Sequence, residues 1–573
     1  MTERLPLTTE RVDTIPLVLA QLERMGVQAL LDEHVPTHGN GVGLSLGWVS
    51  VLWLTHILSE ADQRLNHVKS WAEQRLHTRR EGTGQLVHPC DVSDDRLATV
   101  LETVRDDPRW NAWEGARNQQ VRRVYDLEPA CVRLARTTAS GHWTVTADGL
   151  FPCGHSKDHR PDLPQVKVMV SALDPLGMPV ATDVIPGQRA DDPQALPAIA
   201  RVRESLGRCG LLSGGEGKMG ALETRACIQA EGDYSLGPLA ERPRLPTVWA
   251  GDLAPGWTGE PAVTRIRRPQ QDGTPELIAA GCERLEPVTA AGAGPLHRWL
   301  ERRVVSRSCQ LAQAGERGLR ARLAKAQAAV TALNQHGRGP RRGPDPSGLR
   351  AAVAAMLARS RVHGRRHLRD KEQLGQRPVR RDGLRAATGH LEWAVQVTVS
   401  RDQEAVAAAV RQLGGRVYVT TPPPAQLSLQ EAVRAYRRED VVERARGRLK
   451  GRPLSLTPMD LERDDHATGW IRLLSIGLRV LTRLEFGGRR RLATAKTTLA
   501  GLYVGHPKRA TAHPTAERLL EALQGLTLTL IREGRRWRRH LPPLSRVHQR
   551  ILALLDFPVD IYTRLCPDSR KPP

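Results

Sequence analysis

The sequence predicts a mixed α/β fold, because the spacing of its apolar residues changes twice along the chain. Residues 1 to 125 place apolar side chains at helical intervals. From residue 130 the interval becomes two, and strand-like runs are followed by segments in which helices and strands alternate. That order is typical of a mixed sheet flanked by helices. Beyond residue 426 the pattern is helical again.

The composition indicates a large, basic protein. The chain has 573 residues, which is enough for several domains. It carries 85 Lys and Arg against 62 Asp and Glu, and its net charge is +23. Nucleic acid is the leading partner by charge alone, and a solvated basic surface is the alternative.

Targeting and cysteine signals favour a cytoplasmic protein. No apolar run reaches the roughly 20 residues of a spanning helix, and 48–58 is short enough to be a buried helix. We therefore expect no membrane partner. The eight cysteines are scattered without a C-x-x-C pair, which argues against a zinc site and a disulfide framework and for a reducing compartment.

Turn signals and apolar alternation delimit the elements of the first mixed segment. We expect strands at 132–134, 142–147, 165–173, 180–185, 210–214 and 234–239. We expect helices at 192–206 and 219–230. Strands first, then helix and strand in alternation, predict one sheet with both parallel and antiparallel pairs.

The rest of the chain is predicted as an insertion and a helical end. Within the insertion we expect strands at 263–267 and 394–400, helices at 312–334 and 349–360, and a Gly/Pro/Arg linker at 336–348. Later helices are predicted at 429–450, 471–484, 516–530 and 547–555. The predicted division is 1–125 helical, 126–244 first part of the core, 245–425 insertion, 426–490 last part of the core, and 491–573 C-terminal helical region.

The predicted helix 429–450 carries a mixed polar stripe. Ser428 and Glu431 before its first turn fit a capping box. Tyr436, Glu439, Glu443 and Lys450 follow at offsets 0, 3, 7 and 14, which share one face at about 100° per residue. On periodicity alone a solvated charged face explains the stripe better than a binding site does.

Two motifs carry a family resemblance. Residues 154–165 read GHSKDHRPDLPQ, and the Tyr436, Glu443 and Lys450 spacing follows far downstream. Together they resemble bacterial insertion-sequence transposases of the DDE type, and within these the family-four group with its Y-(2)-R-(3)-E-(6)-K signature. The resemblance implies an RNase H-like core that is interrupted by an insertion and preceded by a helical N-terminal domain.

The resemblance assigns roles to the downstream motif and to the charged loop. It implies that Glu443 is a metal ligand and that Tyr436 and Lys450 contact DNA. Glu439 stands where the family most often has Arg, so one phosphate contact is in doubt. Lys157 and Arg160 in the charged loop would hold phosphate near the active site, with a charged turn between strands as the alternative.

The chain departs from the family pattern at the other two acids. Residues 132–140 read VRLARTTAS, which resembles the family's D-x-T-T strand with Ala135 in the position of the first catalytic Asp. Residues 215–219 read GEGKM, so Glu216 replaces the second Asp and adds a methylene. The resemblance implies that Glu216 and Glu443 hold Mg²⁺ or Mn²⁺ for two-metal phosphodiester chemistry. Loss of the bridging first ligand should be severe.

Nearby acids offer a weak substitute for the missing ligand. Asp148, Asp158 and Asp162 are conceivable replacements, but a turn Asp and a hydrogen-bonded loop Asp are the simpler interpretations. Arg runs at 361–385 and 535–539 could follow a DNA backbone, and Trp537 could stack on a base, although core packing is the usual role of a Trp.

The sequence therefore predicts an impaired DNA transposase. Its expected partners are double-stranded DNA, as terminal inverted repeats and target, and a second copy of the chain that pairs two ends. The alternative is a catalytically inactive DNA-binding protein or repressor derived from a transposase. A basic structural or RNA-binding protein is a third possibility, and it predicts that residues 135, 216 and 443 do not converge.

Overall fold

The structure is a computed structural model that divides into two compact units. Unit 1 comprises Met1–Gly237, Val288–Trp299 and Ala435–Pro573, and unit 2 comprises Pro238–Pro287 and Leu300–Arg434. The described residues are 7–36, 43–125, 131–145, 148–154, 160–174, 176–189, 194–215, 217–239, 263–269, 274–292, 294–333, 346–362, 364–377, 390–438, 440–461, 463–533 and 536–566. None of the helices in these ranges is both long and apolar enough to cross a bilayer.

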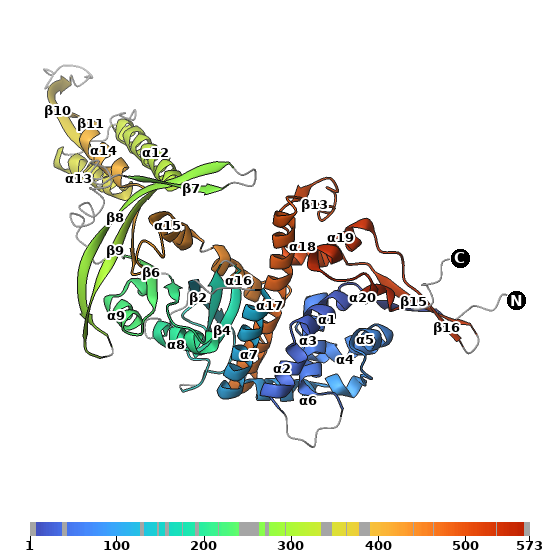
Figure 1. The fold of residues 1–573 in the computed structure, drawn as a ribbon. Helices are drawn as coiled ribbons and strands as arrows, with labels where there is room; N and C mark the ends of the chain where they lie inside the picture. Colours follow the sequence, from blue (N-terminus) through green and yellow to red (C-terminus); the bar gives the residue numbers. More distant parts are fainter. Residues whose placement is uncertain are drawn as a thin grey trace, which may run out of the picture. The chain divides into compact units, whose positions relative to one another are not determined.

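After one short strand, the first part of unit 1 is helical, as the apolar spacing predicts (Figure 1). The elements are β1 (Leu7–Arg11), α1 (Ile15–Arg24), α2 (Val27–His34), α3 (Leu46–Glu60), α4 (Leu65–Glu73), α5 (Leu76–Thr83), η1 (Pro89–Val92), α6 (Asp94–Val104) and α7 (Asp107–Tyr125). The apolar residues of 48–58 lie in α3, which is almost wholly buried, so the prediction of a buried helix is confirmed.

A mixed sheet forms the centre of unit 1. Its strands are β2 (Cys131–Ser140), β3 (Gln165–Asp174), β4 (Met178–Pro186), β5 (Leu212–Gly214) and β6 (Tyr234–Pro238), in the order β4-β3-β2-β5-β6. The first three pair antiparallel, whereas β5 pairs parallel with β2 and with β6. This order and orientation are those of an RNase H-like sheet, so the predicted fold class is confirmed. The intervening helices are α8 (Ala195–Leu206), η2 (Gly217–Gly220) and α9 (Leu222–Ala230).

One predicted strand of this segment is wrong. The described part of 142–147, residues 142–145, forms no strand. Trp143 is buried instead, with its ring centroid 4.4 Å from that of Phe151 and its Nε1 donating to the Met459 carbonyl at 2.7 Å. The apolar alternation around Trp143 therefore reflects one core anchor, because a single large side chain turns inward without a partner strand.

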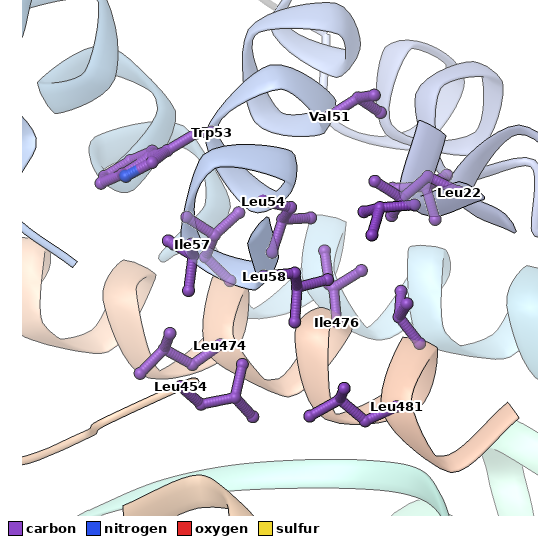
Figure 2. Packing of buried hydrophobic residues seen from close by; sticks show 14 of the residues in the cluster. Leu22, Val51, Trp53, Leu54, Ile57, Leu58, Leu454, Leu474, Ile476 and Leu481 are labelled. Carbon is purple, nitrogen blue, oxygen red and sulfur yellow. The ribbon is translucent and has the colours of Figure 1, made fainter. Parts of the chain in front are cut away.

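The last part of unit 1 supplies the helix that completes the core. Its elements are α16 (Asp440–Lys450), α17 (Asp464–Thr494), β13 (Leu499–Ala500), β14 (Ala510–Thr511), α18 (Ala516–Glu521), β15 (Thr527–Glu533), β16 (Arg536–His540), α19 (Arg546–Leu555) and α20 (Asp560–Thr563). Figure 2 shows Leu54, Ile57 and Leu58 of α3 in the same apolar cluster as Leu474 and Leu481 of α17. The predicted helix 471–484 is thus the centre of a longer one.

The predicted helix 516–530 is wrong in its second half. Residues 527–533 form β15, which pairs antiparallel with β1 on one side and with β16 on the other. The pairing joins Leu7 to Ile531, so the partner strand is at the opposite end of the sequence. Local apolar spacing cannot report such a partner, and this explains the error.

Buried charges connect the helices to the sheet. Arg479 of α17 and Glu114 of α7 form an ion pair of 2.5 Å in which each side chain is 1% exposed. Arg479 Nε also donates to the Pro179 carbonyl of β4 at 3.0 Å, and Glu114 accepts from Arg201 of α8. Four elements therefore meet at one satisfied pair of charges.

Unit 2 is built from long strands and helices. Its elements are β7 (Thr264–Pro269), β8 (Pro275–Ala291), β9 (Leu296–Ser308), α12 (Cys309–Leu333), α13 (Pro346–Arg359), β10 (Arg366–Arg377), β11 (His390–Arg401), α14 (Gln403–Gln412), β12 (Gly415–Thr420) and α15 (Leu429–Arg437). The tips of β8 and β9, and the end of α15, belong to unit 1. Strands β8, β9, β10 and β12 were not predicted; in β8, β9 and β10 charged and polar residues obscure a period of two. Most of the predicted linker 336–348 lies outside the described residues.

The close crossing of α17 and α6 gives a stability test. A Cβ on Gly469 would collide with the backbone carbonyl oxygen of Leu101, whereas a Cβ on Gly487 of the same helix would meet no atom within 4 Å. We expect Gly469→Ala to lower the free energy of unfolding by about 1–3 kcal/mol through overpacking. Gly487→Ala is the matched control and should raise it by about 0.5–1 kcal/mol. Urea unfolding monitored by tryptophan fluorescence measures both, and equal effects would contradict the crossing.

Candidate functional site

A small cavity lies where β2 and β5 run side by side in unit 1. Its volume is about 30 Å³, enough for roughly two water molecules. The residues that line it are Arg133, Leu134, Ala135, Arg136, Gly214, Gly215, Leu236, Tyr436, Val442 and Arg446. The cavity therefore joins three strands of the sheet, β2, β5 and β6, to the region in which α15 ends and α16 begins.

Ala135 lies in the middle of β2, where the resemblance places the first acid. It is 2% exposed and pairs with Val170 of β3. The parallel ladder of β2 with β5 pairs Arg133 with Gly214, and Gly215 beyond it lines the same cavity as Ala135. The residue expected to bear the first carboxylate thus presents a methyl group to the cavity.

Glu216, the predicted second acid, lies outside the described residues. The residue before it, Gly215, is held by a backbone hydrogen bond from its N–H to the Leu236 carbonyl at 3.3 Å. The end of β5 is thereby fixed beside β6 at the cavity wall.

The predicted single helix 429–450 is wrong, because it is two helices. The capping box is confirmed: Glu431 N donates to Ser428 Oγ at 3.3 Å, and Ser428 N donates to the Glu431 carboxylate at 2.9 Å. The first helix, α15, ends at Arg437, and α16 begins at Asp440. The Arg133 guanidinium donates to the carbonyl oxygen of Ala435, which a continuous helix would use for its own ladder. A contact from β2 therefore accompanies the break.

The break separates the residues of the predicted stripe. Tyr436 is on α15 and lines the cavity, while Glu443 and Lys450 are on α16 and are not among its lining residues. The Glu443 side chain is 57% exposed and forms an ion pair with Arg446. Glu439 lies outside the described residues. The structure brings Ala135 and Tyr436 together and leaves the Glu443 carboxylate on the helix surface.

The described lining of the cavity is basic. Arg133 Nη2 lies 2.8 Å from the buried carboxylate of Asp174, which neutralises this guanidinium. Arg446 is paired with Glu443, and Arg136 is the third arginine of the wall. Mg²⁺ requires oxygen ligands, and these residues offer no carboxylate to the cavity, so they do not fit a metal ion. No role was predicted from the sequence for these three arginines. Two of them, Arg133 and Arg136, are charged residues in an otherwise largely apolar strand, and this pattern could have indicated a site there.

A buried carboxylate fixes the orientation of α16. Glu485 of α17 accepts from Arg444 at 2.8 Å and from Arg448, and Arg448 Nε also reaches Glu517 of α18 at 2.7 Å. The Glu485 side chain is 5% exposed, so these contacts are weakly screened by solvent. The network therefore fixes the rotation of α16 about its own axis, and with it the direction in which the Glu443 side chain points.

The charged loop contributes no described residue to the cavity. Lys157 and Asp158 lie outside the described residues. Arg160 is exposed and forms a paired contact with Asp162, with Nη2 and Oδ2 2.7 Å apart. Asp148 is an exposed turn residue. Neither Asp148 nor Asp162 is among the residues that line the cavity.

A separate cluster of possible ligands lies between α6 and α17. The ligand atoms of Glu102, Asp465 and His466 lie within 4.8 Å of one another. Arg463 donates to Glu102 at 2.9 Å and to Asp465 at 2.6 Å, and the guanidinium holds the pKa of Asp465 below its usual range. Arg463 bridges both carboxylates and offsets one of their two negative charges, so the cluster is explained as a surface ion-pair network.

Comparison with known proteins finds a similarity of structure and no match of sequence. No protein-family model matches the chain, and no curated protein matches its sequence. Among solved structures it is similar to a piggyBac transposase in a synaptic complex with hairpin DNA, at a TM-score of 0.23 and 10% sequence identity. The match covers 51% of this chain and 57% of that one, so the chain spans little more than half the length of that transposase.

The burial of β2 gives a chemical test beside the cavity. Burial raises the pKa of the Cys131 thiol to about 12, so at pH 8 the thiol stays protonated and unreactive. Cys90, Cys153 and Cys209 are exposed. We expect iodoacetamide to label these three in the native protein while Cys131 stays unlabelled, as read by peptide mass spectrometry. Labelling of Cys131 at the rate of Cys209 would contradict the placement of β2; unfolded protein serves as the control.

Proposed function

We propose that this protein derives from an insertion-sequence transposase of the DDE type, and that this copy binds DNA but cleaves it poorly. The observation that carries the proposal is Ala135, a methyl group in the cavity beside the central parallel strands of an RNase H-like sheet. The motif in residues 154–165 and the Tyr436, Glu443 and Lys450 spacing support the family.

The loss of chemistry follows from the donor set. Two-metal phosphodiester cleavage needs carboxylates that clamp the ions, one of which activates the nucleophile while the other stabilises the leaving oxygen. Ala135 supplies no oxygen, and arginines stand at the cavity wall. Glu216 and Glu443 remain the proposed metal ligands of the ancestral site, with Mg²⁺ or Mn²⁺ as its metal.

DNA binding is the part of the function that we propose is retained. The chain's charge of +23 favours a polyanionic partner. The proposed contacts are Tyr436 and Lys450 from the downstream motif and Lys157 and Arg160 from the charged loop. Terminal repeats and target DNA are the proposed ligands, and a dimer would pair two element ends.

A repressor is the second candidate. An inactive copy that keeps the DNA surface would occupy the parent element's ends without cutting them. Ala135 favours this candidate, because loss of the carboxylate removes metal affinity while the chain's net charge of +23 still attracts phosphates. Inhibition of cleavage by an active parent enzyme would support it, and cleavage by this chain at a normal rate would exclude it.

Restoring the acid tests the proposed site. We expect the wild type to leave supercoiled plasmid intact with Mn²⁺, and Ala135→Asp/Glu216→Asp to nick it at least about 100-fold faster, the scale of loss for a misplaced catalytic group. The carboxylate regains the ligand that the methyl group lacks. Gel electrophoresis of plasmid topoisomers measures the rate.

The matched control separates charge from shape. Ala135→Asn/Glu216→Asp has nearly the same volume at position 135 without the carboxylate and should stay inactive. Glu443→Gln added to the restored variant should abolish nicking again. Wild-type nicking at the rate of the restored variant, or a restored variant indifferent to Glu443→Gln, would reject the proposed site.

A further inference from the structure

A second, larger cavity lies in unit 1 between α1, α17 and α19. Its volume is about 700 Å³, which is in the range of ligand sites. Its lining includes Arg24 of α1, three arginines of α17 and one of α19. The α17 arginines are Arg483, Arg490 and Arg491. No residue of the smaller cavity beside β2 belongs to it.

The charge of this cavity is strongly positive. Five arginines line it, the fifth being Arg550, and Asp556 is the one acidic residue in its lining. Arg483 and Arg490 are seven residues apart on α17, two helical turns, so their side chains emerge on the same face. The arginines of three helices therefore converge on one space.

Backbone carbonyls hold several of these guanidinium groups in place. Arg24 donates to the Leu555 carbonyl at 2.8 Å and lies 3.7 Å over the Phe557 ring. Arg491 donates to the Ala553 carbonyl at 2.8 Å, and Arg550 donates to the Thr498 carbonyl at 2.5 Å. A carbonyl orients a guanidinium but carries no net charge to cancel it. Arg491 also forms an ion pair of 3.0 Å with Asp556, which offsets one of the five positive charges. The arginines are thus preorganised around a cavity whose lining keeps a net positive charge.

The like charges act on one another. Arg483 is 8% exposed, and burial together with the neighbouring Arg117, Arg24 and Arg490 lowers the pKa of its guanidinium to about 9. Arg117 is also buried, and the pKa of its guanidinium is lowered to about 10 by burial and by Arg479. An anion in the cavity would relieve this repulsion, whereas a neutral ligand would not.

We propose that this cavity is a phosphate-binding site that takes successive backbone phosphates of DNA, away from the ancestral catalytic cavity. The inference rests on the proposed DNA binding and gives it a second location. Arg483 and Arg491 are eight residues apart, about 12 Å along the helix, which matches roughly three phosphates along one strand. Arg490 and Arg550 are exposed at its opening, so a polymer can reach the cavity from solvent.

The test compares two charge-matched variants of the full chain. Arg490→Gln/Arg550→Gln removes two exposed arginines of the cavity. Arg80→Gln/Arg105→Gln removes two exposed arginines elsewhere, Arg80 in α5 and Arg105 directly after α6. Fluorescence anisotropy with a labelled random-sequence duplex gives the affinity at several salt concentrations. We expect the cavity variant to bind at least about tenfold more weakly and to lose about 1–2 units of the log–log salt slope, and the control to change little.

Each outcome separates the two proposals. If the wild type does not bind duplex DNA, the proposed function fails. If it binds and both variants weaken equally, the cavity has no special role and this inference alone fails. Melting temperatures in sodium tripolyphosphate give a further arm: a rise in the wild type but not in the cavity variant, with unchanged DNA affinity of that variant, would assign the cavity to a free oligophosphate and overturn the DNA assignment.

Discussion

The packing of unit 1 depends on one buried pair of charges. Removing Arg479 and Glu114 from water is costly, and the cost is offset only because each charge keeps several hydrogen-bond partners. These partners come from the helical N-terminal part, from the sheet and from the helix that follows it. An arrangement that shifts any of these elements would leave a buried charge without a partner. The pair therefore selects one relative placement of helices and sheet, and the cavity beside β2 inherits its walls from that placement.

Much of the fold could be predicted, and the failures have physical causes. Strands β3, β4, β5 and β6 were predicted because their apolar residues and turns are local signals. The segment 142–147 was wrongly predicted as a strand, because the buried Trp143 gives its sequence the same alternation of polar and apolar residues that a strand has. The helix at 429–450 misled because its break involves Arg133, a residue about 300 positions earlier. Periodicity reports what a segment can do alone, and it does not report a distant side chain that competes for a backbone carbonyl.

In the candidate site, too, local sequence signals predicted some features, and contacts between distant residues decided the others. Motif spacing placed Ala135 and Tyr436, and the structure puts both at one cavity. The direction of Glu443 could not be predicted, because it depends on the helix break and on the ion pair with Arg446. The arginine-lined cavity was invisible in the sequence for another reason. Arg24 and Arg550 come from opposite ends of the chain, and only the packed helices bring them together.

The pairing of β1 with β15 has a consequence for biosynthesis. Leu7 emerges from the ribosome first, yet its partner Ile531 is translated more than five hundred residues later. At about 5–20 residues per second, the interval is roughly half a minute to two minutes. For most of that time β1 lacks its partner strand, and the apolar faces of the first helices that pack on α17 lack their native cover, because α17 begins only at Asp464. The nascent chain must therefore persist as an incomplete core, and chaperones that shield apolar surface would act on it throughout that wait.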